Sequence, residues 1–106
     1  MKLKLNVLER ITVLNLLPKQ ENYLTFRMVT ELKKELSFTE VEIKKFGIVF
    51  TPDGRVSWKD GKTIKNIDVP DTISAMLVEK LKSLEKDKKI DEENVSLYEK
   101  LVLNKN

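Results

Sequence analysis

The fold is decided by the stretch Phe46-Gly47-Ile48-Val49-Phe50-Thr51-Pro52-Asp53-Gly54-Arg55-Val56-Ser57-Trp58, where the hydrophobic period changes from helical to alternating. The run Pro-Asp-Gly in its middle predicts a hairpin turn. A two-residue loop would place Phe50 opposite Ser57, whereas a three-residue loop with Gly54 in the left-handed conformation would place Phe50 opposite Val56. We expect the longer loop, because it gathers four large apolar side chains on one face. The four are Ile48, Phe50, Val56 and Trp58.

A third strand is expected after the turn Asp60-Gly61. A three-residue connection there places Trp58 opposite Ile64, whereas a two-residue connection would bring two lysines face to face. The sequence therefore predicts a three-stranded antiparallel meander over about residues 48–69.

Three helices are expected before the hairpin. The first begins after Asn6, which forms a capping box with Glu9, and ends at Pro18. The second is expected over 25–36, with Thr25 as its cap.

The third helix, over 39–46, has the clearest boundaries of the three. Thr39 and Glu42 form its capping box, and Gly47 ends it. The helix is short and both of its ends are clearly marked, so its C-terminus is expected directly before the hairpin.

Two more helices are expected after the meander. Pro70 suits the first turn of a fourth helix, and Asp91 is the expected cap of a fifth. The fourth has an apolar stripe formed by Ile73, Met76, Leu77, Leu81 and Leu84. Such a stripe lines either the core or a two-fold dimer seam, so the protein is expected to be a monomer or a homodimer.

Together these elements predict an α+β fold in one domain, residues 1–106. About five helices would pack on the three-stranded antiparallel meander, in the order helix-helix-helix-strand-strand-strand-helix-helix.

Composition argues against an enzyme, because the 106 residues contain no histidine and no cysteine. The chain thus lacks the side chain best suited to proton transfer near neutral pH, the commonest neutral metal ligand and the thiolate nucleophile. Acidic residues cluster only where helix starts explain them, and no acidic loop has calcium-loop spacing. The three glycines lie seven residues apart, unlike a phosphate-binding loop. We therefore expect no catalytic residue, no metal and no cofactor.

A DNA-binding alternative follows from the order of the elements. Three helices and a hairpin match a winged helix, with 25–36 and 39–46 as the helix-turn-helix and 48–59 as the wing. The residues expected to contact phosphates are Lys44, Lys45, Arg55 and Lys59. Against this alternative, the net charge is only +3, and Glu40 and Glu42 stand at the helix end that would face the bases.

The apolar face that carries Trp58 also has two interpretations. It would be a peptide-binding surface if it were open to solvent. We expect it to be core instead, because four exposed apolar side chains would favour aggregation.

Several short segments resemble a family of small uncharacterised proteins from tailed bacteriophages and prophages. The segments are Leu8-Glu9-Arg10, Leu14-Asn15-Leu16-Leu17-Pro18, Asn22, Leu24-Thr25, Arg27-Met28-Val29, Leu36-Ser37-Phe38-Thr39-Glu40 and Leu97-Tyr98-Glu99-Lys100. The resemblance implies a small non-enzymatic protein that acts by binding a protein partner, such as a host factor, a defence component or a phage component. It implies no functional residue.

The expected location is the cytoplasm, of the bacterial host if the protein is phage-encoded. The first residues do not have the features of a signal peptide, and no apolar stretch approaches the roughly 20 residues that cross a bilayer. We expect no association with a membrane.

Overall fold

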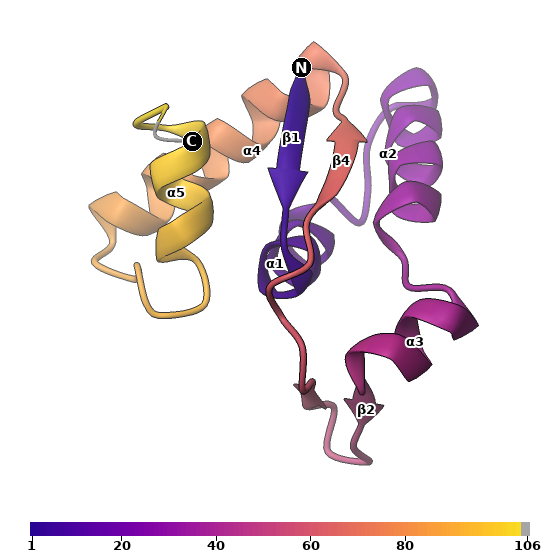
Figure 1. Cartoon of the computed structure of the whole chain (residues 1–106). Helices are drawn as coiled ribbons and strands as arrows, with labels where there is room; N and C mark the ends of the chain where they lie inside the picture. The colour runs from indigo at the N-terminus through magenta and orange to yellow at the C-terminus, as the bar shows by residue number, and fades with distance from the viewer. Residues whose placement is uncertain (105–106) are drawn as a thin grey trace.

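Five helices and four short strands follow one another along residues 1–104, the part of the chain that this computed structural model describes (Figure 1). The elements are β1 (Lys2–Leu5), α1 (Val7–Leu16), α2 (Tyr23–Leu36), α3 (Glu40–Phe46), β2 (Val49–Phe50), β3 (Val56–Ser57), β4 (Lys65–Asp68), α4 (Asp71–Lys86) and α5 (Val95–Leu101). The predicted α+β class is confirmed. The predicted element order is wrong in one respect, because a strand precedes the first helix.

The strands form two separate two-stranded antiparallel sheets, so the predicted meander is wrong. Strand β4 pairs with β1, and the ladder places Leu3 opposite Ile67. The expected pair of Trp58 and Ile64 is not formed, and Ile64 is 54% exposed. The physical reason is burial: pairing β1 with β4 brings Leu3, Leu5 and Ile67 together in the core.

The hairpin of β2 and β3 has the predicted register. Phe50 lies opposite Val56, and Gly54 has a φ of 86°, as the three-residue loop requires. The Thr51 hydroxyl hydrogen-bonds to the Asp53 carboxylate inside the turn. The local turn chemistry therefore predicts the register of this hairpin correctly.

Three helix ends are as predicted. Asn6 and Glu9 form a complete capping box at the start of α1, and Thr39 and Glu42 form another at the start of α3. Gly47 ends α3 with a φ of 66°.

Two helix starts differ from the prediction, by one turn in each case. The cap of α2 is Asn22, whose side chain accepts a hydrogen bond from the Thr25 N–H, so α2 starts before Thr25. Helix α5 begins at Val95, because Asp91 accepts hydrogen bonds within the preceding turn instead of capping the helix itself. At α2 the capping hydrogen bond is thus made three residues before Thr25, and at α5 the Asp91 side chain makes its hydrogen bonds in the turn before the helix.

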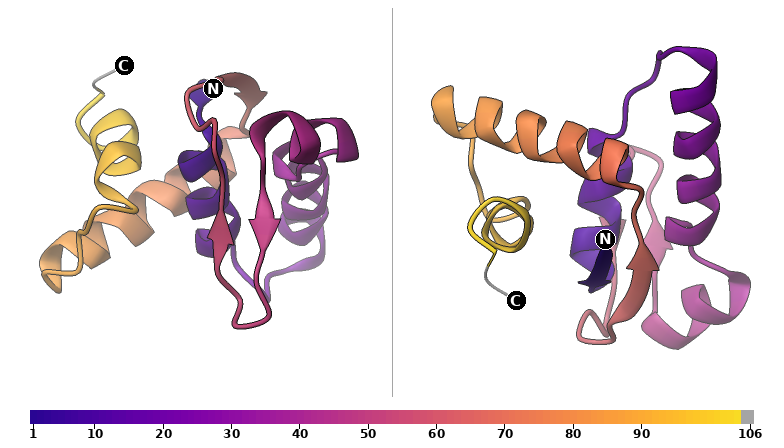
Figure 2. Two further views of the ribbon diagram at one scale, coloured as in Figure 1. Left: turned by 60° about the horizontal axis from the view of Figure 1, so that its bottom comes forward. Right: turned by 90° about the horizontal axis from the view of Figure 1, so that it is seen from above.

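The core has two parts, and α1 contributes to both. The main core joins both strands of the β1–β4 sheet to four helices; its buried residues are Leu3, Leu5, Val13, Leu17, Val29, Leu32, Leu36, Ile67, Val69, Ile73, Leu77, Leu81, Leu97 and Leu101. A smaller core beside the hairpin consists of Val7, Phe46 and Ile48, with partly buried neighbours that include Trp58. Figure 2 shows α2 and α5 on opposite sides of α1 and the β1–β4 sheet.

Candidate functional site

Arg10 is buried on α1 and is fully used in holding the α2–α3 connection. Its guanidinium donates to the carbonyls of Leu36 and Ser37, at 3.2 and 3.0 Å, and to the Glu42 carboxylate at 2.7 Å. The Phe38 ring covers it, with the guanidinium carbon 4.0 Å from the ring centroid. The hydrogen bond from Arg10 lowers the pKa of Glu42 to about 2 against the opposing effect of burial.

Glu9 is the second buried charge and attaches α5 to α1. Its carboxylate accepts hydrogen bonds from the Asn6 main chain at 3.0 Å and from Lys100 Nζ at 2.6 Å. The Ser96 hydroxyl donates to its other oxygen. Both carboxylate oxygens of Glu9 are therefore engaged in contacts that join α5 and the start of α1.

Arg10 and Glu9 are both paired with an opposite charge within the protein. Within residues 1–104, every buried side-chain nitrogen and oxygen has a hydrogen-bond partner, and no three acidic residues are placed to hold a metal ion together.

A hollow lies between α1 and the hairpin, and we call it the hairpin groove. It measures about 520 Å³ and continues into an adjoining hollow of about 310 Å³. The α1 wall consists of Leu8, Ile11, Thr12, Leu14 and Asn15; the hairpin wall consists of Phe50, Gly54, Arg55, Val56 and Trp58; and Ser37, Phe38 and Glu93 complete the lining.

The hairpin groove shows that the predicted burial of the hairpin face is only partly right. Ile48 is 5% exposed and belongs to the smaller core, whereas Val56 and Trp58 are half-buried and Phe50 is 60% exposed. Helices α1 and α3 pack against Ile48 at the base of the hairpin, whereas Phe50, nearer its tip, stays exposed. The alternative interpretation of this face, an open surface, therefore describes its outer half.

Sequence reasoning missed the α1 side of this groove. Ile11 and Asn15 lie on the same side of the helix, four residues apart, and both line the groove. The helical spacing of Ile11 indicated burial, but nothing local indicated that the hairpin would be its neighbour.

The four residues predicted to contact DNA fall into two groups. Lys44 and Lys45 are exposed in the last turn of α3, and the stem of Lys59 lies against Gly47 just after that helix. Arg55 lies on the hairpin, in the hairpin groove, where its Nε is 3.4 Å from an Asp53 carboxylate oxygen.

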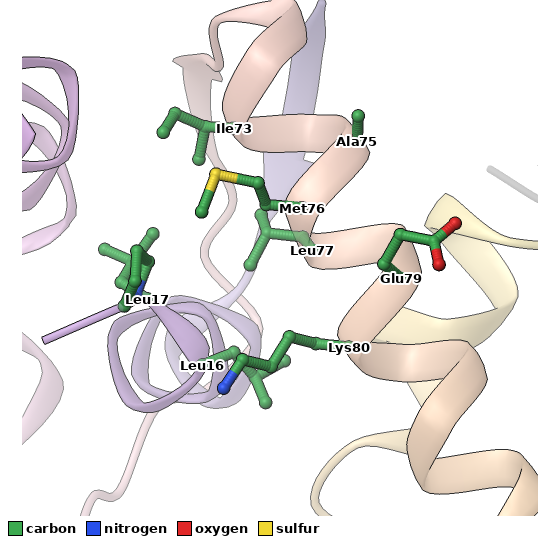
Figure 3. A pocket seen from close by; sticks show the side chains of 9 residues that line it. Leu16, Leu17, Ile73, Ala75, Met76, Leu77, Glu79 and Lys80 are labelled. Atoms are coloured by element: carbon green, nitrogen blue, oxygen red, sulfur yellow. The ribbon is translucent and has the colours of Figure 1, made fainter. Parts of the chain in front are cut away.

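An apolar groove of about 380 Å³ lies between the end of α1 and α4 (Figure 3). Leu16 and Leu17 form one wall, and Met76 lies on the other. The buried part of the α4 stripe, Ile73, Leu77 and Leu81, packs inside the chain, so the stripe serves the core.

No known protein family, curated protein or solved structure matches this chain. Among the described residues, no helix is both long enough and apolar enough to span a bilayer.

Proposed function

We propose that this protein is a non-enzymatic, phage-type binding protein, and that the hairpin groove takes a short segment of a protein partner. The observation that carries the proposal is Phe50, a large aromatic side chain left 60% exposed at the hollow of about 310 Å³ that adjoins the main part of the hairpin groove. An exposed phenylalanine beside an apolar groove is unfavourable in water and becomes favourable once a partner covers it.

The composition of the groove supports a protein ligand. Trp58, Phe50 and Arg55 line its hairpin wall, and aromatic residues and arginine dominate the binding energy of protein interfaces. Asn15 adds an exposed amide that can donate to or accept from a peptide main chain. The absence of histidine and cysteine agrees with binding without chemistry.

The test uses the single tryptophan as a reporter. A random twelve-residue peptide library is selected against the protein, and the selected peptides are titrated while Trp58 emission is recorded. We expect saturable binding with a change in Trp58 emission, because this side chain lines the groove. Selected peptides that bind without perturbing Trp58 would contradict the proposed site.

The matched control comes from the same strand. Phe50 and its neighbour Val49 are both exposed, at 60% and 54%, but adjacent strand residues point to opposite faces. Phe50→Ser should weaken peptide binding about tenfold or more, the size expected for an interface anchor, while Val49→Ser should leave it nearly unchanged. Equal effects of the two substitutions would argue against the hairpin groove.

The alternative function is DNA binding by α3 and the hairpin. It is supported by the contact of Lys59 with Gly47, which adds a third cation to Lys44 and Lys45 at the end of α3. Phosphate contacts by these lysines would give an affinity for duplex DNA that falls steeply with salt.

Charge reversal distinguishes this alternative. The double variant Lys44→Glu, Lys45→Glu should then weaken DNA binding far more than Lys88→Glu, Lys89→Glu, a control with the same net charge on exposed lysines beyond α4. Absence of binding at low salt, or equal loss in both double variants, removes the alternative.

A further inference from the structure

A separate groove of about 370 Å³ lies beside the β1–β4 sheet. It is lined by Arg27, Met28, Glu31, Leu32 and Glu35 of α2 and by Asp68 and Pro70 at the end of β4. We call it the strand-edge groove. Figure 1 shows α2 on the side of β4 that is opposite to β1. The groove meets β4 at Asp68, on the side of the strand that no other strand of residues 1–104 occupies.

The main-chain groups of Asn66 and Asp68 point to this open edge. The main-chain nitrogens of Met1 and Val69 each donate a hydrogen bond to the carbonyl of the other residue, at 3.0 and 2.7 Å. Along an antiparallel ladder, residues whose main-chain groups point toward the partner strand alternate with residues whose groups point away from it. Asp68 is one residue from Val69 and Asn66 is three residues away, so the N–H and C=O groups of both point away from β1.

A second observation confirms this alternation. Lys100 Nζ donates to the carbonyl of Lys4 at 2.6 Å, so that carbonyl points away from β4. Lys4 is the ladder partner of Asn66. In a pair that is not hydrogen-bonded to each other, the main-chain N–H and C=O groups of both residues point away from the partner strand. No main-chain hydrogen bond within the described chain uses the outward groups of Asn66.

We propose that the strand-edge groove binds an extended segment of a partner protein, which adds to β4 as a further strand and carries alternating apolar and basic side chains. Strand addition satisfies the outward main-chain donors and acceptors, which is the source of affinity in this mode of recognition. Because α2 forms the second wall, the added strand would lie between a sheet edge and a helix. This site is independent of the hairpin groove.

The side chains of the groove determine the chemistry of the segment. Met28, which is 37% exposed, offers apolar surface to the segment, whereas Leu32 is 3% exposed and contributes little. The lining contains three carboxylates, those of Glu31, Glu35 and Asp68, and one guanidinium, that of Arg27.

Two of these carboxylates already have a cation nearby. Lys34 Nζ lies 3.3 Å from Glu31 Oε1, and the N-terminal ammonium nitrogen lies 3.6 Å from Asp68 Oδ1. Glu35 has no ion pair within residues 1–104, and its own main-chain carbonyl accepts from Lys65 Nζ at the end of β4. Glu35 is thus the carboxylate that a lysine or arginine of the added strand would pair with.

The test titrates the ¹⁵N-labelled protein with two eight-residue peptides, one alternating valine and lysine and one alternating valine and glutamate. The lysine peptide should shift the amide signals of Asn66 and Asp68 saturably and slow their hydrogen exchange. The glutamate peptide should bind at least about tenfold more weakly. No shift of these two amides at about 1 mM lysine peptide, or equal binding of both peptides, would overturn the proposal.

Two variants locate the site on the protein. Asn66→Pro removes an outward N–H and leaves the β1 ladder intact, and it should abolish binding. Lys4→Pro removes the equivalent outward N–H on the opposite edge of the sheet and should leave binding unchanged. Equal loss in both variants would overturn the proposal.

Two further measurements need no proline in the protein. Methylation of alternate main-chain nitrogens in the lysine peptide should abolish binding, because it blocks the ladder, and unchanged binding would contradict strand addition. Glu35→Lys should weaken the lysine peptide about tenfold. Light scattering completes the test: a dimer that Asn66→Pro dissociates would show that a second copy occupies the edge and would overturn the proposal of a foreign segment.

Discussion

Arg10 shows how one residue fixes the relation of two helices. It is the buried cation of the described chain, and two main-chain carbonyls and one carboxylate surround it. Both carbonyls, of Leu36 and Ser37, belong to the end of α2, where helix carbonyls lack partners. Arg10 therefore supplies the C-terminal cap of α2 from another helix.

Replacing Arg10 by methionine should destabilise the protein by about 3–5 kcal/mol, because the main-chain carbonyls lose their donor and Glu42 loses its ion pair. Arg10→Lys should recover part of the loss, since an ammonium keeps the charge but not the planar fork. Urea unfolding measures both. A cost below 1 kcal/mol for Arg10→Met would mean that Arg10 does not hold α2 and α3 together.

The depressed pKa of Glu42 predicts an acid-sensitive contribution to stability. Its pKa is about 2 in the folded state and 4.5 as a model value, so the stabilisation is complete above about pH 4.5 and is lost as the pH falls toward 2. Glu42→Gln should therefore lose most of this pH dependence, while the wild type retains it. Urea midpoints between pH 2 and pH 6 test this, and identical slopes in both proteins would contradict it.

At the scale of an element, α5 depends on one lysine. Lys100 Nζ lies 2.6 Å from both the Glu9 carboxylate and the Lys4 carbonyl, so a single ammonium joins α5 to α1 and β1. The side chain of Lys100 is 18% exposed, and that of Glu9 is 1% exposed.

Lys100→Met should cost about 2–4 kcal/mol, because it leaves the Glu9 carboxylate buried without a counter-charge. Hydrogen exchange should rise first in α5. Lys86→Met, at an exposed site in the last turn of α4, is the control and should cost less than about 0.5 kcal/mol. If both variants unfolded at the same urea concentration, the Lys100–Glu9 pair would contribute nothing to the attachment of α5.

The hairpin depends on its turn glycine. Gly54 has a φ of 86°, and no atom lies within 4 Å of a Cβ added there, so a side chain would meet backbone strain alone. Gly54→Ala should destabilise the hairpin by roughly 1 kcal/mol and raise amide exchange in β2 and β3, without changing α4. Exchange rates measured by NMR check this. Unchanged rates in the hairpin would show that the turn tolerates a non-glycine residue.

The whole molecule combines a large core with a small one, which predicts two levels of stability. The smaller core has three buried residues, Val7, Phe46 and Ile48, and sits under α3 and the hairpin. A unit that buries so few apolar side chains opens at a lower free energy than the main core. The candidate hairpin groove is therefore built on the less stable part of the protein.

Two substitutions separate these levels. Leu77→Ala in the main core should lower global stability by about 2–5 kcal/mol and raise exchange throughout. Ile48→Ala should instead raise exchange mainly in α3 and the hairpin. If Ile48→Ala raised exchange equally in α4, the two cores would unfold as one unit.

The sequence alone determined what neighbouring residues control. The capping boxes at Asn6 and Thr39, the end of α3 at Gly47 and the pairing of Phe50 with Val56 all depend on groups a few residues apart. The absence of histidine and cysteine likewise follows from the sequence.

The tertiary structure decided the partner of β4 and, through it, the open strand edge that faces α2. Strands β1 and β4 are about sixty residues apart, and local turn chemistry at Asp60-Gly61 favoured the nearer partner. The β1–β4 pair prevailed because it joins Leu3, Leu5 and Ile67 in one core. That pairing left one edge of β4 without a strand partner, which no local pattern specifies.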